Sequence, residues 1–187
     1  FIMRVKPQKD ECFLRFHPHY EKMSCKRFLK QYPNLLIVNA FTKFYAMAGL
    51  RLGYLMTGDL SLLHAVAQQL PEWNVSSIAQ RAGISALQDT EYEKRTRQLI
   101  EKERRYLIQE FLKMGCTVFP SEADYITFRL PQEKTGFLLK ERLLEGKILI
   151  RSCANYRNMP PDCYRIAVKQ HADNEELVRQ VWRILIQ

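Results

Sequence analysis

Apolar and polar positions alternate differently along the chain, and the change of pattern divides it into two regions. Leu35–Val38 is a short, continuous apolar run, which is typical of a strand buried on both faces. A second strand is predicted over Leu50–Thr57, and a helix over His19–Tyr32, which Pro33 would end. The first region therefore combines buried strands with helices.

A largely helical stretch follows these strands. Asp59 is expected to cap a helix whose apolar face consists of Leu62, Leu63, Val66 and Leu70. Pro71–Val75 breaks the pattern, and its tryptophan, Trp73, is expected to pack against the protein or to wall a cofactor pocket. Over 76–114 the sequence predicts helix again, with an interruption near 89–90.

Beyond Gly115, which fits a helix C-terminal stop, the apolar period changes to that of strands. The predicted strands cover 116–119, 124–130, 147–151 and 164–169, with a helix over 134–144. Asp173 or Asn174 is expected to cap a final helix with the apolar face Leu177, Val178, Val181, Trp182 and Leu185. This region predicts a small α+β unit, and we expect two domains, 1–88 and 89–187.

Composition narrows the class of protein. The chain has 187 residues, of which 47% are hydrophobic, so it can bury the core of one domain or of two small ones. It has no apolar run of about 18 residues, and Phe1–Lys6 lacks signal-peptide architecture, so no membrane partner is expected. Five cysteines without a Cys-x-x-Cys pair favour reduced thiols in the cytoplasm, and the histidines show no metal-binding spacing.

The net charge of +9 makes a nucleic-acid ligand one alternative to consider. The basic residues are dispersed among acidic ones instead of forming one run, so no nucleic-acid partner is expected. Anionic groups of a cofactor and a substrate would account for part of the excess charge.

The segment Asn39–Tyr54 carries the residues with the clearest chemistry. Lys43 stands among aromatic residues at a strand end, where desolvation would make its amine available for imine chemistry. Arg51 lies between Gly49 and Gly53, which permit close backbone approach, so it could clamp a phosphate. A solvated surface lysine beside a common glycine pattern is the alternative, and the single residues leave both interpretations open.

The combined pattern Thr-Lys-(five residues)-Gly-Leu-Arg-x-Gly-Tyr is more specific than its parts. It closely resembles the cofactor-lysine segment of fold-type I pyridoxal-phosphate (PLP) enzymes of the aminotransferase class I/II group. The resemblance implies that Lys43 carries pyridoxal 5′-phosphate as a Schiff base. It also implies that Thr42 and Arg51 bind the cofactor phosphate.

A second segment of the same family lies upstream. Asp10–Phe13 resembles the family's Asp-Glu-Ala-Phe/Tyr segment, which implies that Asp10 pairs with the pyridine nitrogen of the cofactor and keeps it protonated. Phe13 stands where many aminotransferases have a tyrosine that bonds the ring oxygen. The alternative for Asp10 is a turn aspartate, because Arg4–Lys9 is too polar for the buried strand that the family places there.

Two arginines in the second region are candidates for substrate binding. Arg151 follows an apolar strand and Arg165 begins one, and an arginine embedded in such a strand needs an anionic partner because it cannot lose its charge. A surface ion pair is the alternative for each. In the family, an arginine in the position of Arg165 holds the substrate carboxylate; Arg151 is left open between substrate phosphate and carboxylate.

The run Ile148–Tyr156 resembles the corresponding segment of a family subgroup that decarboxylates L-threonine O-3-phosphate in cobalamin biosynthesis. The resemblance implies an α/β fold: the C-terminal part of a PLP-binding large domain with a mostly parallel sheet, over 1–88, and a small α+β domain, over 89–187. It further implies a homodimer that acts on a small phosphorylated amino acid. A histidinol-phosphate type of aminotransferase and an inactive fragment remain alternatives.

The resemblance extends over only the C-terminal half or so of such an enzyme. The glycine-rich loop that helps to hold the cofactor phosphate and the aromatic residue that stacks on its ring are not among these residues. We therefore expect the chain by itself to bind PLP weakly or not at all, to lack catalysis and to cover its exposed sheet by self-association. The region over 91–187 is expected to be the better-packed part.

Overall fold

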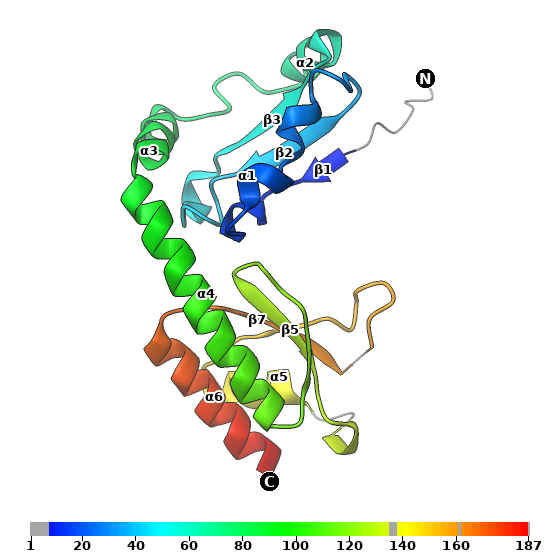
Figure 1. Cartoon of the computed structure of the whole chain (residues 1–187), viewed down its shortest axis with the longest axis vertical. Helices are drawn as coiled ribbons and strands as arrows, with labels where there is room; N and C mark the ends of the chain where they lie inside the picture. Colours follow the sequence, from blue (N-terminus) through cyan, green and yellow to red (C-terminus); the bar gives the residue numbers. More distant parts are fainter. Residues whose placement is uncertain (1–7, 135–137, 161, 187) are drawn as a thin grey trace. The chain divides into compact units, whose positions relative to one another are not determined.

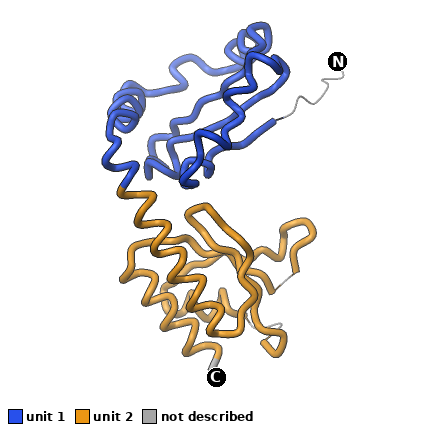
Figure 2. Tube along the Cα trace, viewed as in Figure 1, with its two compact units in different colours: residues 1–94 blue, residues 95–187 orange. Residues whose placement is uncertain are grey.

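The computed structural model of the chain describes residues 8–134, 138–160 and 162–186. The chain forms two compact units, residues 1–94 (unit 1) and residues 95–187 (unit 2), which are coloured separately in Figure 2. The mixed α/β class predicted from the sequence is confirmed. The predicted division at 88 and 89 coincides with the break between two helices, and the assignment of these parts as domains stays a prediction.

Unit 1 is built on a three-stranded sheet in the order β1-β2-β3, formed by β1 (Gln8–Asp10), β2 (Leu36–Ala40) and β3 (Gly53–Thr57) (Figure 1). Strand β1 is parallel to β2, with Asp10 opposite Val38. Strand β3 is antiparallel to β2, with Ala40 opposite Gly53. The sheet therefore has one parallel and one antiparallel pair.

As its composition predicts, the described part of the polar segment before Asp10 is not a buried strand, but it does form a strand. Gln8 and Lys9 lie in β1 with exposed side chains, because backbone pairing with β2 holds this strand without burial. The rest of the polar segment Arg4–Lys9 lies outside the described residues. The strand predicted over Leu50–Thr57 starts later, because Ala48–Leu50 forms a 3-10 turn and the next residue is left-handed.

The helix predicted over His19–Tyr32 is wrong. Instead, α1 (Tyr20–Met23) ends at Ser24 and a 3-10 turn covers Cys25–Phe28. The cause is a buried carboxylate: Glu11 accepts a hydrogen bond from Ser24 Oγ at 2.8 Å and another from the backbone N–H of Cys25 at 2.8 Å. Satisfying this buried charge outweighs the continuation of the helix.

Two capped helices complete the first unit's regular structure. Asp59 caps α2 (Leu60–Ala67) by accepting from the Leu62 N–H at 3.0 Å, as predicted, and Ser76 caps α3 (Ser77–Gln88) by accepting from the Ala79 N–H at 3.2 Å. The predicted apolar face of α2 is only half-buried at Leu62 and Val66, and Leu63 and Leu70 are exposed. Trp73 is 93% exposed, so the predicted packing of this ring is absent from the structure.

A long helix, α4 (Thr90–Lys113), begins in unit 1 and continues through unit 2. The predicted interruption before it is confirmed: the Asp89 side chain accepts a hydrogen bond from the Tyr92 N–H at 2.8 Å and thereby starts a new helix. Its predicted stop at Gly115 is also confirmed, with a φ of 78° that favours glycine.

Unit 2 contains a four-stranded antiparallel sheet in the order β4-β5-β7-β6. The strands are β4 (Thr117–Phe119), β5 (Tyr125–Arg129), β6 (Arg151–Ser152) and β7 (Cys163–Ala167), and the helices after α4 are α5 (Leu139–Glu145) and α6 (His171–Ile186). Figure 1 shows α4 and α6 lying over this sheet, and hydrogen bonds from α6 to Glu103 join the two helices. The strand predicted over 147–151 is wrong except at its last residue, because β6 covers only Arg151–Ser152. Residues 135–137 of the helix predicted over 134–144 lie outside the described residues.

The core of unit 2 lies between its sheet and its helices. Phe111 of α4 meets Phe128 of β5 at a centroid distance of 4.3 Å, and both rings are fully buried. The apolar face predicted for α6 is buried at Leu177, Val178, Val181 and Leu185. The predicted cap of this helix is wrong: α6 begins at His171, and Asn174 is buried with its side chain bonded to Glu103 and to the backbone of Lys169.

Candidate functional site

Three of the predicted cofactor residues gather at one end of the unit 1 sheet. Asp10 is the last residue of β1, Lys43 follows the end of β2, and Arg51 precedes the start of β3. Because β1 and β2 run in parallel and β3 runs against them, these positions share one end of the sheet. We call this the Lys43 end of the sheet; parallel strands of α/β sheets commonly bind ligands at their carboxyl ends.

The turn after Asp10 lies beside Lys43. Lys43 Nζ is 5.6 Å from the ring centroid of Phe13, and Asp10 Oδ1 accepts a hydrogen bond from the Cys12 N–H at 2.9 Å. Burial, together with the hydrogen bond and charge of Asp10, raises the pKa of the Cys12 thiol to about 11, while the positive charge of Lys43 acts in the opposite direction. The pKa of the Cys12 thiol thus responds to charges of opposite sign on Asp10 and Lys43.

Lys43 is exposed, contrary to the expectation that its aromatic neighbours would desolvate it. These neighbours, Phe41, Phe44 and Tyr45, are buried and pack together, with Phe41 stacked on Tyr45 at 5.1 Å. They anchor the backbone of the loop, while the lysine side chain extends outward from it. Thr42, the predicted phosphate ligand before the lysine, is half-buried.

Arg51 lies at the same end of the sheet and has an unusual backbone conformation. Its φ of 52° and ψ of 40° are left-handed, and its Nη1 donates to the carbonyl of Ala48 at 3.3 Å. The side chain is exposed, and the described residues offer it no carboxylate within ion-pair distance. A left-handed non-glycine residue costs conformational free energy, and such positions concentrate at functional sites.

Backbone hydrogen bonds close the loop between these two cations. The Phe41 N–H donates to Leu52 O at 3.0 Å, the Met47 N–H donates to Phe41 O at 3.3 Å, and the Ala46 N–H donates to Lys43 O at 3.0 Å. The backbone of Lys43 is therefore fixed even though its side chain is exposed. An exposed amine on a fixed backbone can bond a carbonyl compound, and an exposed guanidinium at the same end of the sheet can bind an anion.

In unit 2, the two predicted substrate arginines lie opposite each other. Arg151 of β6 pairs with Arg165 of β7, on the sheet face that also carries Thr127 and Arg129 of β5. The guanidinium of Arg165 lies 4.8 Å from the Tyr125 ring centroid. Arg129 has an internal carboxylate partner, Asp162, at 2.8 Å, whereas no carboxylate among the described residues lies within ion-pair distance of Arg151 or Arg165.

This arrangement favours a bound anion. Like charges opposite each other across two strands are destabilising, and an anion between them would offset the repulsion. The Arg151 guanidinium lies 5.5 Å from the centroid of the Tyr156 ring. Both guanidinium groups therefore contact aromatic rings, and neither is paired with a carboxylate of the described residues. The face of the unit 2 sheet opposite its helices is therefore a second candidate anion site.

Sequence reasoning missed a polar cluster that supports the loop after Lys43. Arg15 forms an ion pair with Glu93 and a hydrogen bond with Tyr45, and Tyr45 OH donates to Glu93 Oε1 at 2.6 Å. It also missed the buried role of Glu11. No local pattern signals either feature, because Arg15 and Glu93 are 78 positions apart in the sequence.

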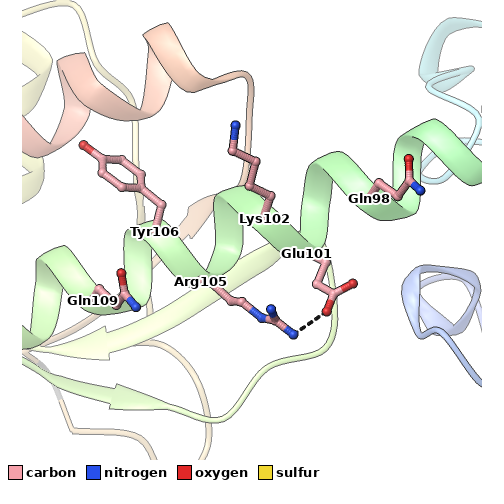
Figure 3. Close-up of a pocket in the computed structure, with 6 residues that line it drawn as sticks. All are labelled: Gln98, Glu101, Lys102, Arg105, Tyr106 and Gln109. Carbon is pink, nitrogen blue, oxygen red and sulfur yellow. Dashed lines mark hydrogen bonds and ion pairs between the residues drawn. The ribbon is translucent and has the colours of Figure 1, made fainter.

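A surface depression on α4 is a weaker candidate. Its lining consists of Gln98, Glu101, Lys102, Arg105, Tyr106 and Gln109 (Figure 3). All six come from successive turns of one helix, and the Glu101–Arg105 ion pair is a common surface contact at i,i+4. This depression brings together no residues from different elements, so it gives no basis for a catalytic site.

Two negative findings concern the described ranges. Within them, no group of three or more His, Cys, Asp or Glu residues is arranged to hold a metal ion. Among the helices of the described part, none is long and apolar enough to cross a membrane. The five cysteines are free thiols.

Comparison with known proteins gives a consistent picture. A family described as "Aminotransferase class I and II" matches residues 10–181. Threonine-phosphate decarboxylase of Salmonella typhimurium is 36% identical over 177 residues, which cover 94% of this chain and 48% of that protein. The chain therefore spans about half the length of the curated relatives it matches.

Solved structures agree with the sequence matches. Histidinol-phosphate aminotransferase from Clostridium acetobutylicum has a TM-score of 0.88 and 31% identity, covering 96% of this chain and 54% of that one. Histidinol-phosphate aminotransferase from Sinorhizobium meliloti, solved in complex with pyridoxal-5′-phosphate, has a TM-score of 0.86 at 22% identity, covering 96% of this chain and 48% of that one. The second likeness concerns the fold alone.

Proposed function

The chain belongs to the aminotransferase class I and II family, whose cofactor is pyridoxal 5′-phosphate, and from this we propose that it forms the C-terminal part of a PLP-dependent decarboxylase. The substrate we propose is a phosphorylated amino acid, L-threonine O-3-phosphate, which would be converted to aminopropanol phosphate and carbon dioxide. The observation that carries the proposal is the gathering of Asp10, Lys43 and Arg51 at one end of the unit 1 sheet.

The residues at the Lys43 end of the sheet fit the cofactor chemically. The primary amine of Lys43 can bond an aldehyde, and the guanidinium of Arg51 with the hydroxyl of Thr42 can bind a phosphate. The carboxylate of Asp10 can accept a hydrogen bond from a protonated pyridine nitrogen. These residues suit three functional groups of PLP, namely its aldehyde, its phosphate and its pyridine nitrogen.

Each of these residues would have a separate role in the reaction. Pyridoxal phosphate supplies, when bound, an electron-accepting ring for the electron pair released as carbon dioxide leaves. Asp10 would keep the ring nitrogen protonated. Lys43 would hold the cofactor covalently, and once the substrate amine has displaced it, its side chain in the ammonium form would donate a proton to the carbon that lost the carboxylate.

The two unit 2 arginines suit a substrate with two anionic groups. Arg165 would bind the carboxylate, and Arg151 would bind either this carboxylate or the phosphate. A phosphorylated amino acid carries both groups, and the 36% identity to a threonine-phosphate decarboxylase supports this substrate class. We place the reaction in cobalamin biosynthesis, in a cytoplasmic homodimer. The free thiols are in keeping with a reducing compartment.

A second candidate is an aminotransferase of the histidinol-phosphate type. It is favoured by the 31% identity and TM-score of 0.88 to such an enzyme. Both reactions use the same cofactor residues and differ in which bond of the substrate is broken.

Product analysis of the full-length protein separates the two candidates. With PLP and L-threonine O-3-phosphate, we expect one carbon dioxide and one amine for each substrate consumed, and no product in Lys43→Ala. Formation of a keto acid that depends on a second keto acid as amino acceptor would reject decarboxylation and support the aminotransferase.

A variant of Arg165 tests the substrate site. Arg165→Lys keeps the charge but loses the planar pair of donors that matches a carboxylate, so kcat/KM should fall on the order of 10- to 1000-fold. The control is Arg183→Lys on the exposed surface of α6, which should leave kcat/KM unchanged. Equal kcat/KM values for Arg165→Lys and the wild type would show that Arg165 does not bind the substrate.

A further inference from the structure

The first turn of α4 is bonded to the loop that follows Lys43. Tyr92 OH donates a hydrogen bond to the backbone carbonyl of Phe44 at 3.0 Å, and Tyr45 OH donates to Glu93 Oε1 at 2.6 Å. Phe44 and Tyr45 are the two residues directly after the lysine. We propose that Tyr92 and Glu93 are positioning residues for Lys43, an assignment that rests on the proposed function of this lysine.

The two contacts restrain different parts of the loop. The bond from Tyr92 fixes the orientation of the Phe44 carbonyl, one residue from Lys43, and the Lys43 carbonyl itself accepts from the Ala46 N–H at 3.0 Å. The bond to Glu93 fixes the ring of Tyr45, which also stacks on Phe41 at 5.1 Å. The backbone of Lys43 is thus held from its carboxyl side, and the direction in which its side chain leaves the loop is set.

The cluster around Glu93 is partly shielded from water, which makes its contacts stronger than surface ones. The side chains of Arg15 and Glu93 are 16% and 14% exposed, and the Arg15 guanidinium also lies over the rings of Tyr20, Phe44 and Tyr45. Charge pairs in such surroundings lose little to solvent screening, and removing one partner takes away this stabilisation from the other.

The protonation state of Tyr45 agrees with its role as a donor. Burial raises the pKa of the Tyr45 hydroxyl, and its hydrogen bond to Glu93 raises it further. The hydroxyl therefore stays protonated across the physiological pH range and keeps its bond to the carboxylate. Arg15, whose pKa is lowered by burial but raised more strongly by Glu93 and Tyr45, stays charged in the same range.

This network differs from one that merely stabilises the fold, because it acts on a single exposed amine. A stabilising role would predict that weakening it lowers the unfolding temperature and changes the reactivity of all lysines alike. A positioning role predicts a selective loss at Lys43, because enzymatic groups displaced by about 1 Å can lose up to about 100-fold in rate.

The experiment measures how fast borohydride traps PLP on individual lysines of the full-length protein, with peptide mass spectrometry to locate the label. Two variants weaken the network: Tyr92→Phe removes one hydroxyl, and Glu93→Gln removes one charge. Tyr32→Phe, at an exposed tyrosine of unit 1, is the matched control. All proteins are compared below their unfolding transitions, with exposed Lys30 as the internal reference.

We expect labelling of Lys43 relative to Lys30 to fall about tenfold in Tyr92→Phe and in Glu93→Gln, and to be unchanged in Tyr32→Phe. If Glu93→Gln does not fold, Tyr92→Phe, which removes no charge, decides the question. Unchanged relative labelling in the folded variants would overturn the positioning role while leaving the proposed function intact. Absence of Lys43 labelling in the wild type would instead reject the proposed function.

Discussion

Units 1 and 2 have similar alternation of sheet and helix but differ in how fully their apolar faces are covered. In unit 2 the faces of α4, α5 and α6 meet the sheet, and Leu107, Phe111, Ile126, Phe128, Leu139, Leu143 and Val181 have no exposed surface. Among the described side chains of unit 1, Ile37 alone among the large apolar ones reaches this state. The apolar periodicity of a helix thus indicates which of its faces is apolar. It does not indicate whether residues of the same unit bury that face.

The two helices α2 and α6 make this difference concrete. Both carry apolar residues at helical spacing, but Leu177 and Val181 of α6 are buried, whereas Leu63 of α2 is exposed. The apolar side chains Ile78, Ile84 and Leu87 of α3 are exposed as well. Unit 1 should therefore depend more than unit 2 on contacts beyond its own residues for its stability.

The largest predicted effect is the loss of a core ring in unit 2. Phe111→Ala removes a fully buried side chain that contacts Phe128, and it should lower the free energy of unfolding by roughly 3–5 kcal/mol in urea denaturation. The control is Leu112→Ala, the next residue of α4, which is 55% exposed and should change stability by less than about 0.5 kcal/mol. Equal effects of the two changes would mean that unit 2 is not the closed core described above.

The corresponding change in unit 1 is Ile37→Ala in the central strand. We expect a loss of roughly 2–4 kcal/mol, because Ile37 is fully buried. Its neighbour Val38 is 39% exposed, so Val38→Ala should cost less than about 1 kcal/mol. If unit 1 is the weaker unit, Ile37→Ala should also separate the unfolding curve into two transitions, and a single shared transition would contradict the difference between the units.

A smaller effect is predicted at the buried carboxylate that joins α4 to α6. Glu103 accepts hydrogen bonds at 3.0 Å from Asn174 Nδ2 and at 3.0 Å from His171 Nδ1. Glu103→Gln should lower the free energy of unfolding by about 1–3 kcal/mol, since a charge-assisted bond is lost in a buried place. The matched control is Glu101→Gln, whose exposed ion pair with Arg105 should contribute less than about 0.5 kcal/mol.

The same carboxylate predicts a pH dependence. Burial alone would raise the pKa of Glu103, but the hydrogen bonds from Asn174 and His171 outweigh burial and lower it. Because the pKa is lower in the folded state, the carboxylate stabilises unit 2 fully above the unfolded value of about 4.3, and this contribution is lost as the pH falls through the folded pKa. Acid unfolding curves of Glu103→Gln should lack this decline, whereas those of Glu101→Gln should retain it.

The smallest predicted effect concerns a helix end. Gly115 has a φ of 78°, and a Cβ there would meet its nearest atom, in Pro131, at 3.5 Å, so conformational strain is the main cost of Gly115→Ala. We expect a loss of about 1 kcal/mol. Gly49→Ala in unit 1 has open space around it and should be close to neutral by thermal unfolding. A neutral Gly115→Ala would show that the end of α4 can relax.

The features predicted from the sequence are those decided by neighbouring residues. The caps at Asp59 and Gly115, the break before α4 and the apolar face of α6 all depend on local spacing. The motif around Lys43 was identified because each of its residues has its own chemical task. The strand β1 was not expected, because its stability comes from pairing with a strand that lies well over twenty residues later in the chain.

The features that escaped prediction depend on distant partners. The helix breaks at Ser24 because its hydroxyl donates a hydrogen bond to Glu11, 13 positions away in the sequence. The residues of the Arg15–Glu93 ion pair are 78 positions apart. The exposure of Lys43 follows from the inward packing of its aromatic neighbours, which the sequence pattern alone does not determine. The reduced binding of PLP by the chain alone stays a prediction.

The placement of the two tryptophans gives the protein an intrinsic fluorescence probe in each unit. Trp73 of unit 1 is 93% exposed, so its emission should be that of an indole in water, and Trp182 of unit 2 is half-buried, so its emission should lie to the blue. Single Trp→Phe variants would let each unit be followed separately. A blue shift of Trp73 emission on adding any binding partner would then report directly that the surface around it has become covered.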